Sequence, residues 1–401
     1  MAPAPAPGSA STSTIPHRGL IPYSDDRTMP PPRRTIVVVT GSRAEFGLLR
    51  PVMRAIEAHE ALDLRIAVTG THLLEPALTI NEVKAEFEID AAIPMQSPGP
   101  TGRLADAAAL GRGISGFADY FAKAASPPEV VLVLGDRIEA FAAAAAASVA
   151  GIRVAHMHGG DRASGLADEA LRHAITKLAH IHLPATAHSA ERIICMGEIP
   201  LSVHLVGSPA IDGLGDIAPL DDAAYAALGR PQIVFVFHPA GHAPEEEWAN
   251  TERLLRLCKR YGSVLALHPN FDAGREAILE AIETAGCPAR PHLPRAQFIG
   301  LLRRARVLVG NSSAGLIECA AIGTPSINVG PRQAGREAPD GVVSVPDGDF
   351  GAVDLALEEF FGGRPGPTSH PFGNGHAGEK TAEVLATFKP DHHPLIKLNT
   401  F

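Results

Sequence analysis

The chain has 401 residues, 45% of them hydrophobic and 20% charged, a length more typical of two domains than of one. Its formal net charge is −9, from 35 basic and 44 acidic residues, which argues against a surface for nucleic acid. The four cysteines lie far apart without a Cys-x-x-Cys pair, so we expect no disulfide framework and no thiol-rich zinc site, and a cytoplasmic location. Apolar runs stay short of the ~18 residues of a membrane helix, so we expect no membrane insertion.

Residues 1–34 are rich in proline, alanine and serine, and we predict that they form a disordered leader outside the fold. The segment lacks the apolar core of a secretory signal, and Met29 is an alternative start of the protein. From Thr35 onward, β-branched runs alternate with stretches of helical spacing, which is typical of βαβ units in a buried parallel sheet. The expected strands of this first half are 36–40, 64–70, 130–135, 153–158 and 203–207, and its expected helices are 45–59, 137–150 and 168–180.

A passage rich in glycine, proline and aspartate follows Pro209 and is the expected connection to a second domain. The alternation then restarts, with expected strands at 232–238, 263–268, 306–310 and 326–330 and a late helix at 379–388. We therefore predict an α/β protein with two Rossmann-like, doubly wound parallel-sheet domains, 35–212 and 213–375, followed by a C-terminal helix and tail, 376–401. Ligands bind beyond the carboxyl ends of strands in such sheets, so the interdomain cleft is the expected site.

Polar residues follow the expected strands of the first half. The loop 41–47 opens a helix, and its N–H groups together with Arg43 could hold a phosphate; a simple helix-capping turn is the alternative. Asp136 comes directly after strand 130–135, where it either faces the cleft or caps the next helix.

The densest group of polar residues is His156-Met157-His158-Gly159-Gly160-Asp161. On a strand, His156 and His158 would point to one face, so we expect both imidazoles to emerge together beside Asp161 and to transfer protons. A His-x-His metal site and a set of core residues are the alternatives. Asp168 and Glu169 then open a helix with Arg172 one turn later, either as part of this cluster or as an i,i+4 ion pair.

In the second half, His238 and His268-Pro269-Asn270 end strands, where the histidines either face the cleft or bond locally. The segment 310–318 places glycine and hydroxyl residues between a strand and a helix, which favours diphosphate binding, with Glu318 accepting from ribose hydroxyls. Arg332 and Arg336 lie in a later loop, where they pair with phosphate, with the other domain, or only with solvent.

Together these segments resemble the UDP-N-acetylglucosamine 2-epimerases, specifically the hydrolysing branch that supplies sialic-acid-type sugars. The resemblance covers nearly the whole chain after residue 34. It is carried by TGSRAEFGLLRP (40–51), GDRIEA (135–140), HMHGGD (156–161), DEALRHAITKLAHIH (168–182), HPNFDAG (268–274) and GNSSAGLIECAAIGTPSINVGPRQAGRE (310–337).

The resemblance implies a GT-B fold of two Rossmann-like domains and a reaction that needs no metal or other cofactor. The nucleoside diphosphate is eliminated across C1 and C2 of the sugar, and water then adds to the 2-acetamidoglucal to release a free N-acetylmannosamine-type sugar. The catalytic groups implied are Asp136, His158, Asp161, Asp168, Glu169 and His238. The groups implied to bind substrate and nucleotide are Arg43, Arg172, His268, Asn270, Ser312, Ser313, Gly315, Glu318 and Arg332.

Two positions depart from the non-hydrolysing bacterial enzymes and resemble the hydrolysing branch. His158 stands where the former carry a glutamate, and Leu48 where they carry a lysine. A non-hydrolysing epimerase, a GT-B glycosyltransferase and a nucleotide-sugar sensor are the alternative functions. The motifs leave UDP and GDP, and the sugar substituents, equally open, and the resemblance implies a homo-oligomer, a dimer or tetramer.

Overall fold

The computed structural model describes residues 1–3, 33–75, 78–98, 102–162, 168–270, 274–363 and 369–400. The expected leader, 1–34, lies outside these residues except at its two ends, and the first strand already begins at Arg34. From Arg33 onward the described chain forms one compact unit. None of the helices in these ranges is long and apolar enough to cross a membrane.

The first half of the chain folds around a parallel sheet of six strands in the order β3-β2-β1-β4-β5-β6. Its strands are β1 (Arg34–Thr40), β2 (Leu62–Thr69), β3 (Ala91–Ile93), β4 (Val130–Leu134), β5 (Arg153–Met157) and β6 (Ile181–Leu183). Its helices are α1 (Arg43–Ala58), α2 (Ile80–Lys84), α3 (Arg103–Lys123), α4 (Ile138–Val149), α5 (Asp168–Leu178) and α6 (Ala187–Cys195).

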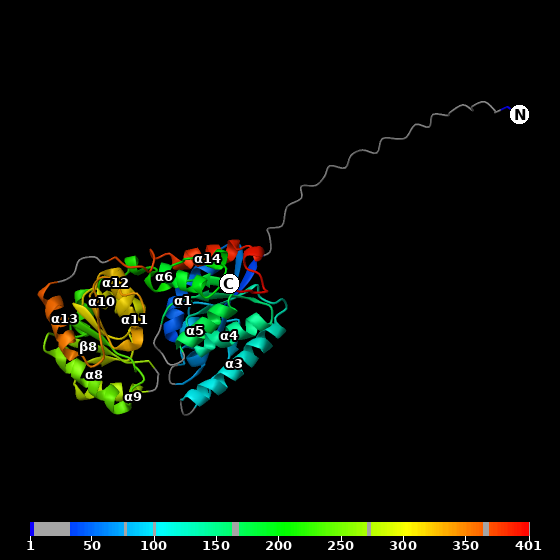
Figure 1. The fold of residues 1–401 in the computed structure, drawn as a ribbon. Helices are drawn as coiled ribbons and strands as arrows, with labels where there is room; N and C mark the ends of the chain where they lie inside the picture. Colours follow the sequence, from blue (N-terminus) through cyan, green and yellow to red (C-terminus); the bar gives the residue numbers. More distant parts are fainter. Residues whose placement is uncertain are drawn as a thin grey trace. The chain divides into compact units, whose positions relative to one another are not determined.

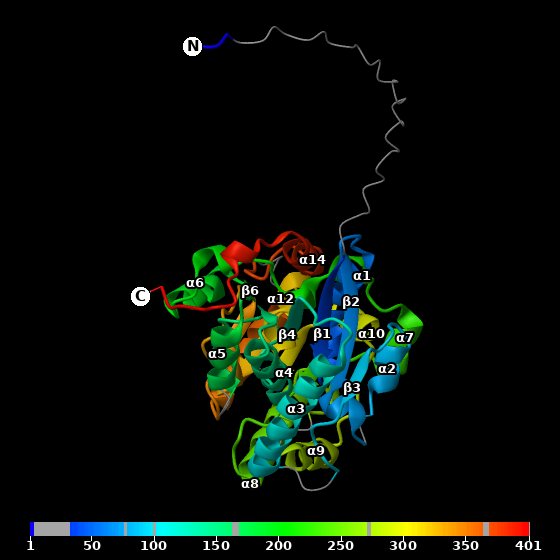
Figure 2. The same cartoon turned by 90° about the vertical axis from the view of Figure 1, so that its right-hand side faces the viewer.

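The hydrophobic run of β1 explains the layers around this sheet. Ile36 and Val38 face the core that α1 covers, whereas Val37 and Val39 face the core that α3 and α4 cover (Figure 2). Because alternate side chains of a strand point to opposite faces, the continuous run Ile36–Val39 is buried on both sides.

The second half repeats this plan, with strand order β12-β11-β10-β7-β8-β9. Numbered within each half, both sheets have the doubly wound order 3-2-1-4-5-6. The strands of the second half are β7 (Ile233–Val236), β8 (Val264–Leu267), β9 (Ala289–Arg290), β10 (Val307–Gly310), β11 (Ser326–Val329) and β12 (Val342–Val345). Its helices are α7 (Asp222–Ala227), α8 (Pro244–Lys259), α9 (Arg275–Thr284), α10 (Arg295–Leu302), α11 (Ser313–Leu316), α12 (Glu318–Ile322) and α13 (Phe350–Gly362), with α8, α9 and α13 packed on one face of the sheet (Figure 1).

Two segments join the halves. The passage after Pro209 forms the 3-10 turns η3 (Pro209–Ile211) and η4 (Leu214–Asp216) and then α7. After α13 the chain returns to the first half, where α14 (Ala377–Thr387) packs against α1 (Figures 1 and 2). Leu385 and Phe388 enter the same core as Phe46 of α1. The guanidinium of Arg34 donates to the carbonyls of Leu385 and Phe388, at 3.2 and 3.1 Å, so the chain's return closes the first core.

The prediction of a strand at 203–207 is wrong, whereas the other expected strands are confirmed within a few residues. There, only Val203 forms an isolated bridge, with His182, and β6 is the sixth strand instead. Residues 203–207 do run beside β6, since the N–H groups of His204 and Val206 donate to His182 and Pro184. Pro184 has no N–H to return, which interrupts a continuous ladder.

The helix α3 was not expected from the sequence, because its three glycines weaken the helical signal. Gly113 explains why one of them is there: a Cβ at this position would lie 3.0 Å from Ala142 and 2.8 Å from the sulfur of Met95. The glycine therefore lets α3 pack closely against α4.

Candidate active site

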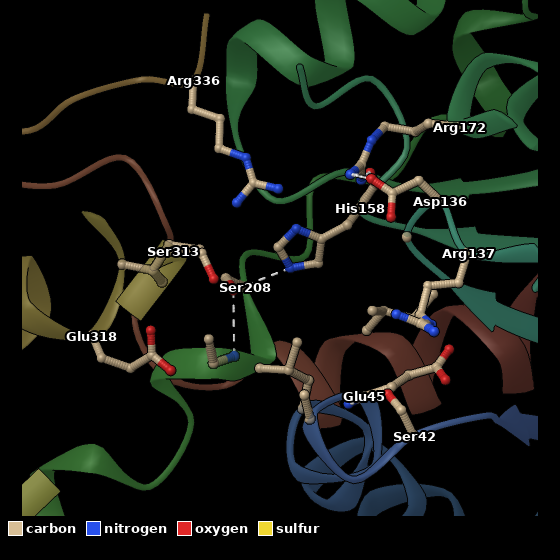
Figure 3. A pocket seen from close by; sticks show the side chains of 16 residues that line it. Ser42, Glu45, Asp136, Arg137, His158, Arg172, Ser208, Ser313, Glu318 and Arg336 are labelled. Atoms are coloured by element: carbon tan, nitrogen blue, oxygen red, sulfur yellow. Dashed lines mark hydrogen bonds and ion pairs between the residues drawn. The ribbon is translucent and has the colours of Figure 1, made fainter. Parts of the chain in front are cut away.

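A cavity of about 190 Å³ lies where the carboxyl ends of the first-half strands face α11 and α12. Both halves of the chain contribute to it (Figure 3). Its polar lining consists of Ser42, Glu45, Asp136, Arg137, His158, Arg172, Ser208, Ser313, Glu318 and Arg336. Of the residues expected from the sequence, it therefore brings together Asp136, His158, Arg172, Ser313 and Glu318.

Arg172 holds the carboxyl ends of β4 and β5 in place. Its side chain is 3% exposed, its guanidinium pairs with the carboxylate of Asp136, and it donates to the carbonyl of His158 at 2.7 Å. Asp136 does not cap α4, since the N-cap residue is Arg137, so the capping alternative is wrong. Arg172 thus has a partner on a neighbouring strand end, whereas the side chain of Asp168 lies outside the described residues.

His158 leaves the strand and turns toward the cavity. Its φ of 59° is left-handed, so the two histidines do not emerge together as expected. The ring of His156 is buried instead, bonded to the carbonyl of Gly135 at 2.8 Å and to Thr176 at 3.1 Å, and burial lowers its pKa to about 3. His156 is therefore a core residue, and this geometry does not support the His-x-His metal alternative.

Asp161 supports the His158 ring from behind. Its carboxylate lies 2.8 Å from Nδ1 of His158 and accepts from the hydroxyl of Ser189, also at 2.8 Å. Burial alone would raise the pKa of Asp161, but its interactions with His158 and Arg172 hold the pKa well below its ordinary value. A carboxylate on one ring nitrogen is the arrangement that orients a histidine for proton transfer from the other nitrogen.

The loop after β1 contributes a buried carboxyl group to the cavity. Ser42 caps α1 by accepting from the N–H of Glu45, so the loop forms a helix-capping turn, while its expected role in holding an anion stays a prediction. Glu45 accepts the N–H of Gly41 at 2.6 Å, and burial raises its pKa to about 8. Arg43 does not line the cavity: its guanidinium lies 2.5 Å from Glu82, and its expected contact with a diphosphate stays a prediction.

Replacing Glu45 by glutamine should change how stability depends on pH. Because its pKa is raised, the folded state keeps the Glu45 proton up to a pH of about 8, whereas an unfolded chain loses it near the ordinary glutamate pKa of 4.5. The stabilisation is therefore complete below pH 4.5 and is lost as the pH rises toward 8. In thermal unfolding, the Tm of Glu45→Gln minus that of the wild type should increase as the pH rises from 4.5 to 8. The exposed Glu57→Gln on the same helix should show no such increase. A difference that is constant with pH would contradict the assignment.

In the second half, Asn311 organises the ends of β7 and β10. Its side chain accepts the N–H of His238 at 2.7 Å and donates to the carbonyl of His238 at 2.8 Å. The N–H of Asn270 donates to Nδ1 of His238, and Arg332 donates to the carbonyl of Asn311, both at 3.1 Å. Burial, and then the charge of Arg332, lower the pKa of His238 to about 3. His238, Asn270 and Arg332 thus form a cluster of their own, and His238 is neutral.

The segment after β10 divides its expected ligands between the cavity and the fold. Ser312 caps α11 by accepting from the N–H of Ala314 at 3.3 Å. A Cβ on Gly315 would lie 3.3 Å from Leu308 and 3.5 Å from Ser326, so this glycine serves close packing on the sheet. Only Ser313 and Glu318 of the expected group line the cavity.

Glu318 is held at the cavity by Arg295 of α10, whose guanidinium lies 3.9 Å from its carboxylate. The Glu318 side chain is 12% exposed, and burial raises its pKa. Two carboxylate oxygens at this position can accept from neighbouring hydroxyls of a ribose.

We expect Glu318→Ala to weaken the binding of UDP about tenfold or more, because the lost hydrogen bonds have a charged acceptor. Isothermal titration with UDP measures the change, and the exposed Glu276→Ala is the matched control. An unchanged Kd would contradict the expected contact between Glu318 and the ribose.

Glu169 and His268 are two further expected residues that lie away from the cavity lining. Glu169 is near His173 of the same helix at 3.4 Å and Arg162 at 3.9 Å. His268 donates its N–H to the carbonyl of Arg290, and burial lowers its pKa.

The sequence did not single out Ser42, Glu45, Arg137 or Ser208 as site residues, although all four line the cavity. Arg336 is the arginine of its loop that reaches the cavity, with Arg332 bonded to Asn311 instead. Figure 3 shows the Arg336 side chain pointing into the cavity. The Nε of Arg336 also donates to the carbonyl of Arg162 in the first half, at 3.1 Å. The strand order of the sheet reverses between β1 and β4. Ser42 and Glu45 follow β1 at this switch point, and this position was the signal that could have identified them as site residues.

A family model described as UDP-N-acetylglucosamine 2-epimerase matches residues 54–386. The chain belongs to the UDP-N-acetylglucosamine 2-epimerase family. A relative of this epimerase from Legionella pneumophila, named UDP-N,N'-diacetylbacillosamine 2-epimerase (hydrolyzing), is 35% identical and covers 92% of this chain and 100% of its own. Another, UDP-N-acetylglucosamine 2-epimerase of Neisseria meningitidis serogroup B, is 34% identical and covers 76% of this chain and 81% of its own.

The fold of this epimerase is also that of solved members of the family. The crystal structure of UDP-GlcNAc 2-epimerase from Neisseria meningitidis bound to UDP-GlcNAc matches with a TM-score of 0.74 at 18% identity, over 88% of this chain and 99% of that one. The expected GT-B-type fold of two Rossmann-like parallel sheets is confirmed.

Proposed function

We propose that this epimerase is hydrolysing: it converts a nucleoside diphosphate-linked 2-acetamido sugar and water into nucleoside diphosphate and the free sugar inverted at C2. In the first step a base removes the C2 proton while the bond from C1 to the diphosphate breaks. In the second step water adds at C1 and C2 takes a proton on the opposite face. The free sugar would serve the synthesis of sialic- or legionaminic-type acids.

The observation that carries the proposal is the pairing of Asp136 with Arg172 next to the His158–Asp161 pair at one cavity. These groups can exchange protons with the sugar, while the guanidinium of Arg336 and the hydroxyl of Ser313 lie on the second-half side, where an anionic diphosphate would be stabilised (Figure 3).

Support for hydrolysis comes from the two positions that depart from the non-hydrolysing pattern, because both Leu48 and His158 line the cavity. The name of the Legionella relative points the same way. An apolar Leu48 in place of a cation removes a group that would retain the diphosphate at the site.

The test is to incubate the protein with UDP-N-acetylglucosamine in deuterated water and follow products by NMR. We expect UDP and a free sugar that carries deuterium at C2. An intact UDP-linked epimer without free UDP would show a non-hydrolysing enzyme, and UDP release that requires an added acceptor would show a glycosyltransferase. Repeating the assay with GDP-linked and 4-acetamido-6-deoxy sugars identifies the preferred base and substituents.

A further inference from the structure

We infer that Ser208 is a third member of the proton-transfer unit, carrying protons between Nε2 of His158 and the reacting atoms. The inference rests on the proposed function, because it assigns His158 a proton-transfer role. It was not suggested by the sequence, in which Ser208 precedes a proline in the connection between the two halves.

The hydrogen bonds around His158 define where its proton lies. The Nδ1 atom is 2.8 Å from the Asp161 carboxylate, and Nε2 is 3.1 Å from the Ser208 hydroxyl (Figure 3). An ionised carboxylate only accepts, so in the neutral form of the ring Nδ1 carries the hydrogen and Nε2 presents a lone pair. The Ser208 hydroxyl accepts the N–H of Ala210 at 3.3 Å, and toward the lone pair of Nε2 in this neutral tautomer it is the donor.

Both partners of this hydrogen bond lie at the cavity wall. His158 is 7% exposed and Ser208 is fully buried, yet both line the cavity. Because Nε2 is hydrogen-bonded to the Ser208 oxygen, we assign this oxygen as the relay for a proton that enters or leaves Nε2. The backbone N–H of Ser208 donates to the carbonyl of Phe372 at 2.9 Å, so the segment returning from the second half holds the serine in place.

The relay acts in the addition of water. As the water oxygen forms its bond to C1, one water proton moves to the Ser208 oxygen and the Ser208 proton moves to Nε2 of His158. The electron pair of the C1–C2 double bond takes a proton at C2 from a carboxylic acid of the cavity. His158 ends the step as an imidazolium paired with Asp161, and the carboxylic acid ends it as a carboxylate. His158 then loses its extra proton to solvent, and the carboxylate takes one up.

Steady-state kinetics with UDP-N-acetylglucosamine test this relay. Ser208→Ala should lower kcat about 100-fold with little change in the Kd for UDP. In a double-mutant cycle, Ser208→Ala combined with His158→Gln should be no slower than His158→Gln alone, because residues that act as one unit are not additive. Additive losses, or wild-type kcat in Ser208→Ala, would overturn the relay.

A second role must be separated, since Ser208 also caps η3. Ser208→Asn can restore such a cap but has no hydroxyl, so it should recover the Tm without recovering kcat. Recovery of both would reduce Ser208 to a cap. Ser202→Ala is the matched control: Ser202 is also a buried serine in a 3-10 turn, but its hydroxyl donates to the carbonyl of Ile199 and it does not line the cavity.

NMR of protein labelled with ¹⁵N in the histidine rings tests the arrangement without any substrate. The His158 signals, assigned with His158→Gln, should show a protonated Nδ1 and an Nε2 that accepts a hydrogen bond, and the Nε2 signal should move in Ser208→Ala. A protonated Nε2 or an unmoved signal would overturn the inference. A wild-type protein that releases no nucleoside diphosphate from any nucleotide sugar, but shows these signals, would overturn the proposed function instead.

Discussion

Asp136→Asn should lower kcat about 1000-fold while leaving the affinity for UDP close to that of the wild type. Asparagine has nearly the same shape but is a weak base, and general acid–base groups contribute about 10²–10⁴ to the rate. The amide can still accept a hydrogen bond from Arg172, which keeps the arginine and the carbonyl of His158 in place. The loss should therefore appear in kcat rather than in binding, as expected for a group that acts in the transition state.

Two measurements are needed: single-turnover release of UDP, and UDP affinity by titration. Asp63→Asn is the control. It replaces the same carboxylate by the same amide, but Asp63 lies on β2 beside Arg65 and away from the cavity lining. Near-normal turnover in Asp136→Asn would remove this carboxylate from the mechanism. A large loss of UDP affinity would instead assign Asp136 to binding.

Glu198→Gln should lower the free energy of unfolding by about 2–4 kcal/mol, the largest effect on stability that we expect from a substitution outside the cavity. The Glu198 side chain is 3% exposed and is contacted by Lys177 at 2.5 Å, Lys397 at 2.6 Å and His182 at 3.0 Å. Glutamine leaves two ammonium groups beside a neutral amide. We place the effect below the upper limit for buried ion pairs, because both lysines are partly exposed.

The same carboxylate predicts how stability responds to acid. Burial alone would raise the pKa of Glu198, but hydrogen bonds from His182, Lys177 and Lys397 lower it to about 2. A lowered pKa gives stability that is present above the ordinary glutamate pKa of 4.5 and is lost as the pH falls toward 2. Chemical denaturation at several pH values should show the Glu198→Gln difference shrinking over this range. The exposed Glu191→Gln on α6 is the control, and a difference that persists at pH 2 would contradict the assignment.

The ends of the strands could be predicted from the sequence, because a buried strand is a continuous apolar run that stops where polar residues begin. The run Ile36–Val39 is apolar on both faces, and the polar residues that follow β4, β5 and β10 mark the edge where a ligand is expected. Asp136, His158, Ser313 and Glu318 were found in this way, and the structure places all four at one cavity.

The remaining site residues depend on contacts that no local pattern contains. Arg172 has an acid one turn earlier on its own helix, yet its described partner is Asp136, 36 positions away. His158 turns away from His156 because its backbone becomes left-handed at the end of β5, and strand alternation cannot predict that change. Ser208 reaches His158 across 50 positions, and only the path of the chain between the halves brings the two together.

The return of α14 to the first half has a consequence for the order in which the protein can fold during synthesis. The core around Phe46 includes Leu385 and Phe388, and the Lys397 ammonium donates to the carbonyls of Thr176, Lys177 and Ala179 at the end of α5. A ribosome makes these residues only after the whole second sheet. The first half, which holds most of the proposed catalytic groups, is therefore the last to be completed, and until then an apolar face of α1 is available to chaperones.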